Sequence, residues 1–164
     1  MRDEKLSDEP YENNKIPDHW PSSAKRSVVG KIIAVSGLRL LGRGTELIFP
    51  RSRSFPRHSI AEITFTNQNG VVPGNTVDSV LYLGFLEVVT GGIIVVGQPV
   101  DIGSTEIGKV VGFSDIHEPN HLNILVSGEG GQYKHIMESA MDGTVVTLDI
   151  KLNDDVIFGK DAAT

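Results

Sequence analysis

The chain has 164 residues, of which 39% are hydrophobic and 22% charged, and it contains no cysteine. This is the length of one domain and the composition of an ordinary globular protein, so wholesale disorder is excluded. Without cysteine, a disulfide framework, a thiol nucleophile and a cysteine-ligated metal are excluded as well. We find neither the roughly 20 consecutive apolar residues of a bilayer-spanning helix nor a secretory signal, and therefore expect a cytoplasmic protein without a membrane span.

The net charge of −6 is unevenly distributed along the chain. Residues 1–23 carry six acids and three bases, residues 24–60 one acid and eight bases, and residues 61–164 fourteen acids and four bases. Because an acidic surface repels phosphate backbones, we expect no nucleic-acid partner. The basic block has two interpretations. Its side chains pair with the acids downstream, or they bind a phosphorylated or acidic protein or a small phosphate-bearing ligand.

The chain divides into three predicted segments. Residues 1–26 contain three prolines and many charges, with only Ile16 and Trp20 as large hydrophobic residues near their end, which predicts a polar, largely disordered N-terminal tail. Residues 27–152 are expected to form a single β-barrel domain, and residues 153–164 a short C-terminal tail. Trp20 could dock the N-terminal tail onto the domain or onto a neighbouring subunit, so a homo-oligomer stays open.

From Ser27 onward, short runs rich in valine and isoleucine alternate with glycines and turn signals. The runs that predict strands are, in chain order, SVVGKIIAVSGLRL, ELIFP, SIAEITFT, DSVLYLGFLEVV, IIVVGQPVDIG, EIGKVVGF, HLNILVSG and TVVTLDIKL. Apolar and polar residues alternate in SIAEITFT, which is typical of a strand with one face in the core. In DSVLYLGFLEVV, Gly84 predicts a bend or bulge. About eight short strands without alternating helices favour an all-β fold, a small glycine-rich β-barrel.

One segment departs from this β pattern. In QYKHIMESAMDG the apolar residues recur at the spacing of one helix face, at Tyr133, Ile136, Met137, Ala140 and Met141. This spacing predicts one amphipathic helix near residues 131–142. We expect Ile136, Met137 and Met141 to plug one end or edge of the barrel.

The segment DIHEPNH is the strongest candidate for a metal site. It contains Asp115, His117, Glu118 and His121, whose side chains are common ligands of zinc and similar divalent ions. Pro119 precludes a regular helix, so these residues should lie in a loop between EIGKVVGF and HLNILVSG. They either converge on a divalent metal or form a polar turn. No organic cofactor is indicated.

A second candidate site is RSRSFPRHS, residues 51–59, which holds Arg51, Arg53, Arg57 and His58. Guanidinium groups bind phosphate and carboxylate through paired hydrogen bonds, so the three arginines are candidates for anion binding. An imidazole among arginines suits phosphate chemistry, which makes His58 a candidate catalytic residue, as nucleophile or as acid and base. The alternative is a mobile polar loop. Motifs of serine hydrolases and of standard nucleotide-binding loops do not occur.

The stretch VVGQPVDIGSTEIGKVVGFSDIHEPNHLNILVSGEGG, followed by MDGTVVTLDI, resembles the glucitol/sorbitol-specific IIA component of the bacterial phosphotransferase system. The short motifs of that family match Val96-Gly97 with Ile102-Gly103, Ile107 to Gly112, Asn120 to Gly128, and Asp142 to Val146. The early LI-F strand of the family corresponds to Leu47 to Phe49. The resemblance implies an unusual glycine-rich β-barrel.

The chain departs from that family at its acceptor residue. The family's phospho-accepting histidine follows an apolar strand soon after the LI-F segment, whereas the aligned EITFTNQNG has no histidine and His58 lies on the other side of the strand. Three functions therefore stay open. The protein is a divergent regulatory or protein-interaction module lacking the acceptor histidine, a phosphocarrier using His58, or a metal-dependent enzyme using the loop of residues 115–121.

Overall fold

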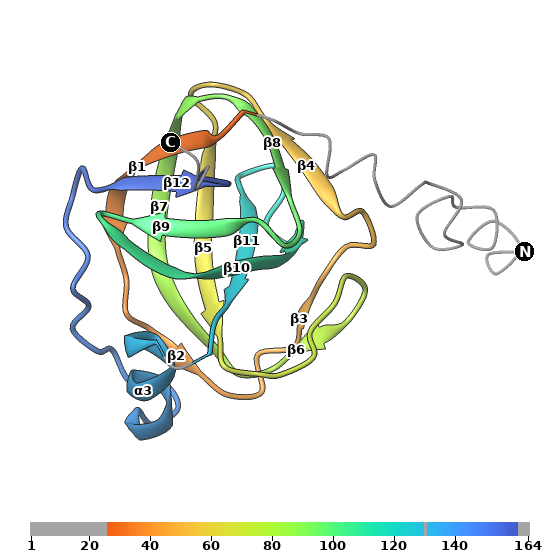
Figure 1. Ribbon diagram of the computed structural model, residues 1–164. Coiled ribbons are helices and arrows are strands. Elements are labelled where there is room, and N and C mark those ends of the chain that lie inside the picture. The colour runs from red at the N-terminus through yellow and green to blue at the C-terminus, as the bar shows by residue number, and fades with distance from the viewer. Residues whose placement is uncertain (1–25, 130, 161–164) are drawn as a thin grey trace, which may run out of the picture.

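The computed structural model describes residues 26–129 and 131–160 (Figure 1). These residues form twelve strands and one helix, in the order β1 (Val28–Val35), β2 (Arg39–Leu40), β3 (Thr45–Glu46), β4 (Ser52–Phe55), β5 (Ile60–Thr66), β6 (Thr76–Val77), β7 (Val80–Thr90), β8 (Gly92–Val95), β9 (Pro99–Ile102), β10 (Thr105–Ser114), β11 (Leu122–Ser127), α3 (Gln132–Ser139) and β12 (Asp155–Phe158). The predicted all-β barrel with one short helix is confirmed. The expected N-terminal tail up to residue 25, with Trp20, lies outside the described residues.

Seven strands form a closed barrel in the spatial order β1-β12-β9-β10-β11-β5-β7, and β7 pairs with β1 to complete the ring. All neighbouring strands in the ring are antiparallel except β11 and β5, which are parallel. Strand β2 extends the sheet from β7, and the pairs β3-β6 and β4-β8 form two small separate sheets. Closure gives each barrel strand a partner on both sides, which removes the unpaired edges that promote aggregation.

The barrel extends past residue 152, where the sequence led us to expect a C-terminal tail. Strand β12 lies between β1 and β9, and its Val156 is the partner of Gly30 on one side and Ile102 on the other. Val156 and Phe158 are fully buried in the barrel core. The expectation was wrong because two alternate apolar residues in DVIF are enough to complete a closed sheet.

The segment TVVTLDIKL, expected as the closing strand, forms no strand of its own. Val145 makes an isolated bridge to Leu38, and Leu148 and Ile150 pack into the main core. Its apolar residues therefore anchor an extended connection that runs from α3 back to β12 (Figure 1).

Helix α3 covers one end of the barrel, close to β2 (Figure 1). Tyr133 and Met137 are buried in the barrel core, and the ring of Tyr133 packs against Phe65 with centroids 5.5 Å apart. The helix ends at Ser139, earlier than expected, and the backbone then becomes extended. Met141 is consequently 74% exposed, so its predicted plug role was wrong. In the described part of the chain, no helix is long and apolar enough to cross a membrane.

The barrel wall built from β5, β7 and β11 is buried on both faces. Ile63 and Phe65 of β5 point into the main core, whereas the alternate residues Glu62, Thr64 and Thr66 are buried on the outer face. A second apolar cluster lies on that outer face, formed by Leu47, Val77, Val80, Tyr82 and Leu125. The predicted alternation of β5 therefore occurs, but its polar face meets a second layer of the protein.

The segment ELIFP supplies part of this second layer. Only Thr45–Glu46 pairs as strand β3, and Leu47 to Phe49 form no strand. Leu47 is nevertheless buried, in the second cluster. The expected strand at ELIFP is thus mostly a covering loop whose leucine packs on the outside of the barrel.

A β-bulge at Gly84 shifts the alternation of β7, as the sequence predicted. The backbone φ of Gly84 is 156°, and a Cβ at this position would clash with the carbonyl oxygen of Ala34. Residues in the main core are, before and after the bulge, Leu81, Leu83, Leu86 and Val88. The shift leaves Phe85 on the outer face, where it is the cross-strand partner of Glu62.

Candidate metal centre and its pocket

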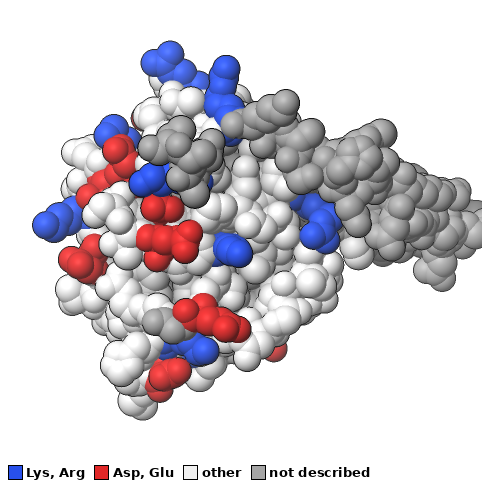
Figure 2. Space-filling model, viewed as in Figure 1, with Lys and Arg blue, Asp and Glu red and all other residues white. Residues whose placement is uncertain are grey.

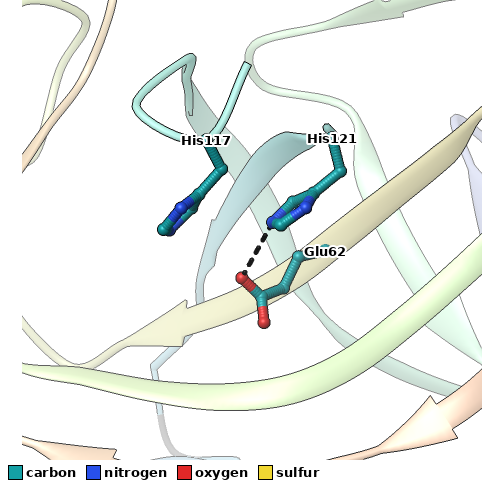
Figure 3. Close-up of side chains that lie close together, drawn as sticks. All are labelled: Glu62, His117 and His121. Carbon is teal, nitrogen blue, oxygen red and sulfur yellow. Dashed lines mark ion pairs between the residues drawn. The ribbon is translucent and has the colours of Figure 1, made fainter. Parts of the chain in front are cut away.

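Glu62, His117 and His121 each bring one potential ligand atom into a group in which these atoms lie within 4.8 Å of one another. Figure 3 shows both imidazoles reaching from the segment between β10 and β11, with the Glu62 carboxylate of β5 beneath His121. The parallel pairing of β11 with β5 explains why His121 and Glu62 lie close together. Asn123 of β11 is the partner of Glu62, so His121, just before the strand, lies above that carboxylate.

Glu62 is a buried carboxylate with two close side-chain neighbours. Its Oε1 accepts a hydrogen bond from Nδ2 of Asn123 at 3.0 Å and lies 3.5 Å from Nε2 of His121. The side chains of Glu62 and His121 are 11% and 9% exposed. Burying a carboxylate is unfavourable unless hydrogen bonds or a positive charge compensate it. One amide donor compensates Glu62 in part, which leaves it suited to hold a cation.

The ring of His121 is fixed from three sides. Phe85 meets it edge-on with centroids 4.9 Å apart, and His117 stacks on it at the same centroid distance with an angle of 24°. Its Nδ1 lies 2.7 Å from Nδ2 of Asn120. Its buried Nε2 has no hydrogen-bond partner among the described residues. A rigid imidazole therefore directs an unpaired nitrogen toward the Glu62 carboxylate.

The spacing of the three ligand atoms fits a divalent metal. Tetrahedral zinc with bonds of about 2.0–2.1 Å places its ligand atoms about 3.3–3.4 Å apart. The pair His121–Glu62 is already separated by 3.5 Å, and no pair exceeds 4.8 Å. His117 lies in a turn segment, and such connecting segments are more mobile than the strands, so its imidazole can move toward the other two ligand atoms. Two imidazoles and one carboxylate are the donor set of catalytic zinc and non-haem iron(II) sites.

The three residues line one wall of a pocket of about 320 Å³ on the outside of the barrel. The other lining residues come from the segment after β1 and from β7, namely Ser36, Leu38, Leu40, Arg43, Tyr82 and Phe85. Small-molecule sites typically have volumes of about 300–1,000 Å³, so this pocket can hold a small ligand. A ligand there would contact the candidate metal centre directly.

The structure brings together two of the four residues proposed as metal ligands from the sequence. His117 and His121 join Glu62, whereas Asp115 is exposed and does not belong to the group. Glu118 lies 3.4 Å from the guanidinium of Arg53 instead. Glu62 was missed because it lies on a distant strand. The available signal was a carboxylate within the apolar alternation of SIAEITFT, but the partner of that strand is not readable from sequence.

The arginine-rich segment does not gather around one point in the part of the chain that the structure describes. Arg53 lies on β4 beside Glu118, and Arg57 lines a separate, wide-open pocket of about 650 Å³ next to Gly91. Arg51 and His58 are exposed and line neither this pocket nor the one beside Glu62. The candidate catalytic role of His58 therefore has no surrounding arginine cluster.

Basic and acidic side chains are interspersed on the face shown in Figure 2. Two bases of the basic block pair with acids further along the chain: Lys31 lies 2.7 Å from Asp155, and Arg53 lies 3.4 Å from Glu118. These pairs support the interpretation that the basic side chains form ion pairs with downstream acids on the barrel surface. Anion binding by Arg51, Arg53 and Arg57 stays a prediction.

Fold and site together define a small closed β-barrel with a candidate His₂Glu metal centre on its outer wall. The chain belongs to a family of unknown function, DUF6917, whose model matches residues 22–154. The match includes all three residues of the centre and ends just before β12. No curated protein and no solved structure matches the chain. The resemblance to the glucitol/sorbitol-specific IIA component stays a prediction, because neither result bears on it.

Proposed function

We propose that the protein is a metal-dependent enzyme whose divalent ion is held by Glu62, His117 and His121 and acts on a small molecule in the adjoining pocket. The observation that carries this proposal is the unpaired Nε2 of His121, buried beside the buried carboxylate of Glu62. Buried polar atoms without a partner are rare and unfavourable. A metal ion bonded to both groups would compensate each of them.

The donor set favours catalysis over a purely structural role. Structural zinc sites use four protein ligands, whereas three protein ligands leave a position for water or substrate. A bound ion would supply a Lewis acid and lower the pKa of its water. Asn123 would hold Glu62 in position through its hydrogen bond. Asn120 would orient His121 through Nδ1. When Nε2 binds the metal, Nδ1 carries the proton, and a half-turn of the Asn120 amide places its acceptor oxygen at that nitrogen.

The second candidate is a metal-free acid–base pair of His121 and Glu62. The contact of Asn120 with His121 favours it. Its Nδ2 faces Nδ1 of His121 at 2.7 Å, so the amide donates to that nitrogen in this orientation. The proton of the neutral imidazole then resides on Nε2, toward Glu62. An imidazole oriented by a carboxylate at the edge of a pocket is suited to general acid–base catalysis.

Metal titration of the purified, chelator-treated protein tests the proposal. We expect one equivalent of Zn²⁺ or Co²⁺ to bind in calorimetry, with Co²⁺ giving the visible absorption of a low-symmetry site. Substituting a ligand by His117→Ala, His121→Ala or Glu62→Gln should weaken binding by more than about 100-fold, beyond the usual effect of outer residues. The exposed His135 on α3 provides the matched control, since His135→Ala should bind metal like the unmodified protein.

Two outcomes would contradict the metal proposal. One is the absence of stoichiometric binding for Zn²⁺, Co²⁺, Mn²⁺ and Fe²⁺; the other is undiminished binding by folded His121→Ala protein. If no metal binds, ¹⁵N NMR of the imidazole nitrogens tests the acid–base pair of His121 and Glu62. A proton on Nε2 that Glu62→Gln perturbs would support the acid–base pair.

The regulatory module and the His58 phosphocarrier remain alternatives predicted from the sequence. His58 lies in an exposed turn after β4, and its arginine neighbours in sequence point to different places among the described residues. Transfer of label from a phosphorylated donor to the unmodified protein, but not to His58→Ala, would favour the phosphocarrier over the metal proposal.

A further inference from the structure

We infer that the pocket beside the candidate metal centre takes a small organic anion, whose carboxylate or phosphate group pairs with Arg43. The inference deepens the proposed function by naming its substrate class, and it rests on that function for the ligand's second contact, the one with the metal. Its own determinants, Arg43 and Tyr82, lie outside the metal-binding group.

Arg43 is held in place without being neutralised. Its Nε donates a hydrogen bond to the hydroxyl of Tyr82 at 2.8 Å, and its backbone N–H donates to the carbonyl of Asp78 at 3.1 Å. Among the described residues, no carboxylate lies at ion-pair distance from its guanidinium, and neither terminal nitrogen donates a hydrogen bond. Arg43 is a half-buried residue, and a guanidinium with two free terminal groups is suited to paired hydrogen bonds with an anion.

The charges around the pocket favour an anion once a metal is bound. Among the described residues that line the pocket, Glu62 contributes the one carboxylate and Arg43 the one permanently charged cation. A divalent ion on Glu62 would leave the lining with an excess of positive charge. Such charge attracts an anionic ligand and repels a cationic one, most strongly at low ionic strength, because the pocket is open to solvent.

The remaining walls describe the body of the ligand. Leu38, Leu40 and Phe85 line the same pocket and offer apolar contacts to a ligand there. Its volume of about 320 Å³ is at the lower end of the range for small-molecule sites. The pocket therefore fits a small acid with an apolar body, bound through its anionic group at Arg43 and through another donor at the metal.

Three probes with the same ring separate charge from shape: benzoate, phenyl phosphate and the neutral benzyl alcohol. Each is titrated into Zn²⁺-treated protein and into metal-free protein, with binding followed by amide chemical shifts in ¹H–¹⁵N NMR. We expect benzoate or phenyl phosphate to bind at least tenfold more tightly than benzyl alcohol, with shifts at Leu38, Tyr82 and Phe85. The stronger of the two anions identifies the carboxylate or the phosphate as the preferred group.

Arg43→Ala should weaken anion binding at least tenfold and leave Zn²⁺ affinity unchanged. Arg43→Lys keeps the charge without the planar guanidinium. Its anion affinity should lie between those of the unmodified protein and of Arg43→Ala, and it replaces Arg43→Ala if that variant fails to fold. Arg26→Ala, at another arginine that lines the other pocket, is the matched control and should bind both anions beside Glu62 normally.

The outcomes for the metal and for the anion are distinguishable. If Zn²⁺ binds but folded Arg43 variants hold the anions as well as unmodified protein, the inference is wrong and the metal proposal stands. If Zn²⁺ does not bind but the metal-free protein holds an anion through Arg43, the metal proposal is wrong and the anion contact stands. Equal binding of benzyl alcohol and the anions, or no binding of any probe, overturns the inference.

Discussion

Glu62 and His121 lie side by side, with Oε1 of the glutamate 3.5 Å from Nε2 of the histidine, and both side chains are buried. Their contact depends on the parallel pairing of β5 with β11, the one parallel pair in the barrel ring. The antiparallel neighbour β7 completes the surroundings, because its bulge turns Phe85 outward against the ring of His121. Small displacements of either strand would therefore change the geometry of the centre.

Asn123→Ala should lower the metal affinity without unfolding the protein. The amide of Asn123 donates to the Glu62 oxygen that faces His121, so its loss frees the carboxylate to rotate. Removal of such outer hydrogen bonds typically lowers metal affinity about 10–100-fold. Competition with a chromophoric chelator measures the change. The matched control is Asn67→Ala, which removes a partly buried amide bonded to Ser79 outside the pocket. Equal affinities for all three proteins would mean that Asn123 does not position the carboxylate.

Met137→Asp and Met141→Asp should have opposite consequences for stability. Met137 is 2% exposed in the barrel core, so aspartate there buries an unpaired charge and should lower the free energy of unfolding by at least about 3 kcal/mol. Met141 is 74% exposed, and the same substitution should change it by no more than about 0.5 kcal/mol. Urea unfolding followed by far-UV circular dichroism gives both values. Similar midpoints for the two variants would show that α3 does not seal the barrel.

A chain that stops after Asp154 should not fold, whereas one that stops after Lys160 should fold like the unmodified chain. The shorter chain lacks β12, which leaves β1 and β9 each without a partner on one side, opens the barrel, and removes Phe158 from the core. Loss of one buried phenylalanine alone typically destabilises by about 3–5 kcal/mol, a large part of the usual stability of about 5–15 kcal/mol. Circular dichroism and amide dispersion in NMR distinguish the two chains. A folded shorter chain would restore the view that the C-terminal segment is a tail.

Above pH 10 the protein should lose stability through Tyr133. Burial raises the pKa of Tyr133, and the carboxylates of Asp149 and Asp154 add to the rise. The unfolded chain releases the phenol proton at its ordinary pKa of about 10, while the folded chain keeps it. The folded state then binds more protons, so stability falls as pH rises from the unfolded pKa to the folded pKa, by at most about 1.4 kcal/mol per pH unit.

Tyr133→Phe removes this titration and is expected to flatten the decline, which urea midpoints between pH 8 and pH 11 would measure. Tyr82→Phe is the control, because it removes the hydroxyl of another buried tyrosine, one that accepts a hydrogen bond from Arg43. Parallel curves for Tyr133→Phe and the unmodified protein would show that Tyr133 ionises with equal ease in both states.

Much of the fold was predictable from local pattern. The valine- and isoleucine-rich runs at SIAEITFT, DSVLYLGFLEVV, EIGKVVGF and HLNILVSG are strands β5, β7, β10 and β11. The bulge at Gly84 and the helix around Met137 are also confirmed. These features depend on period-2 or period-3.6 spacing and on glycine's freedom, which a chain expresses over a few residues. The expected tail from residue 153 failed because a short apolar alternation reveals no partner strands.

By itself, the sequence determined that the protein is an all-β barrel and that His117 and His121 share a loop. Only the tertiary structure decided which carboxylate meets them. Asp115 and Glu118 are close to the histidines in sequence, but turn geometry directs them elsewhere; Glu62 reaches the site through strand pairing between distant segments. The same long-range packing buries the outer face of β5 under a second layer and so places Glu62 in a pocket. Hydrogen-bonded strand neighbours are chosen by the closure of the whole sheet, and no local spacing encodes that choice.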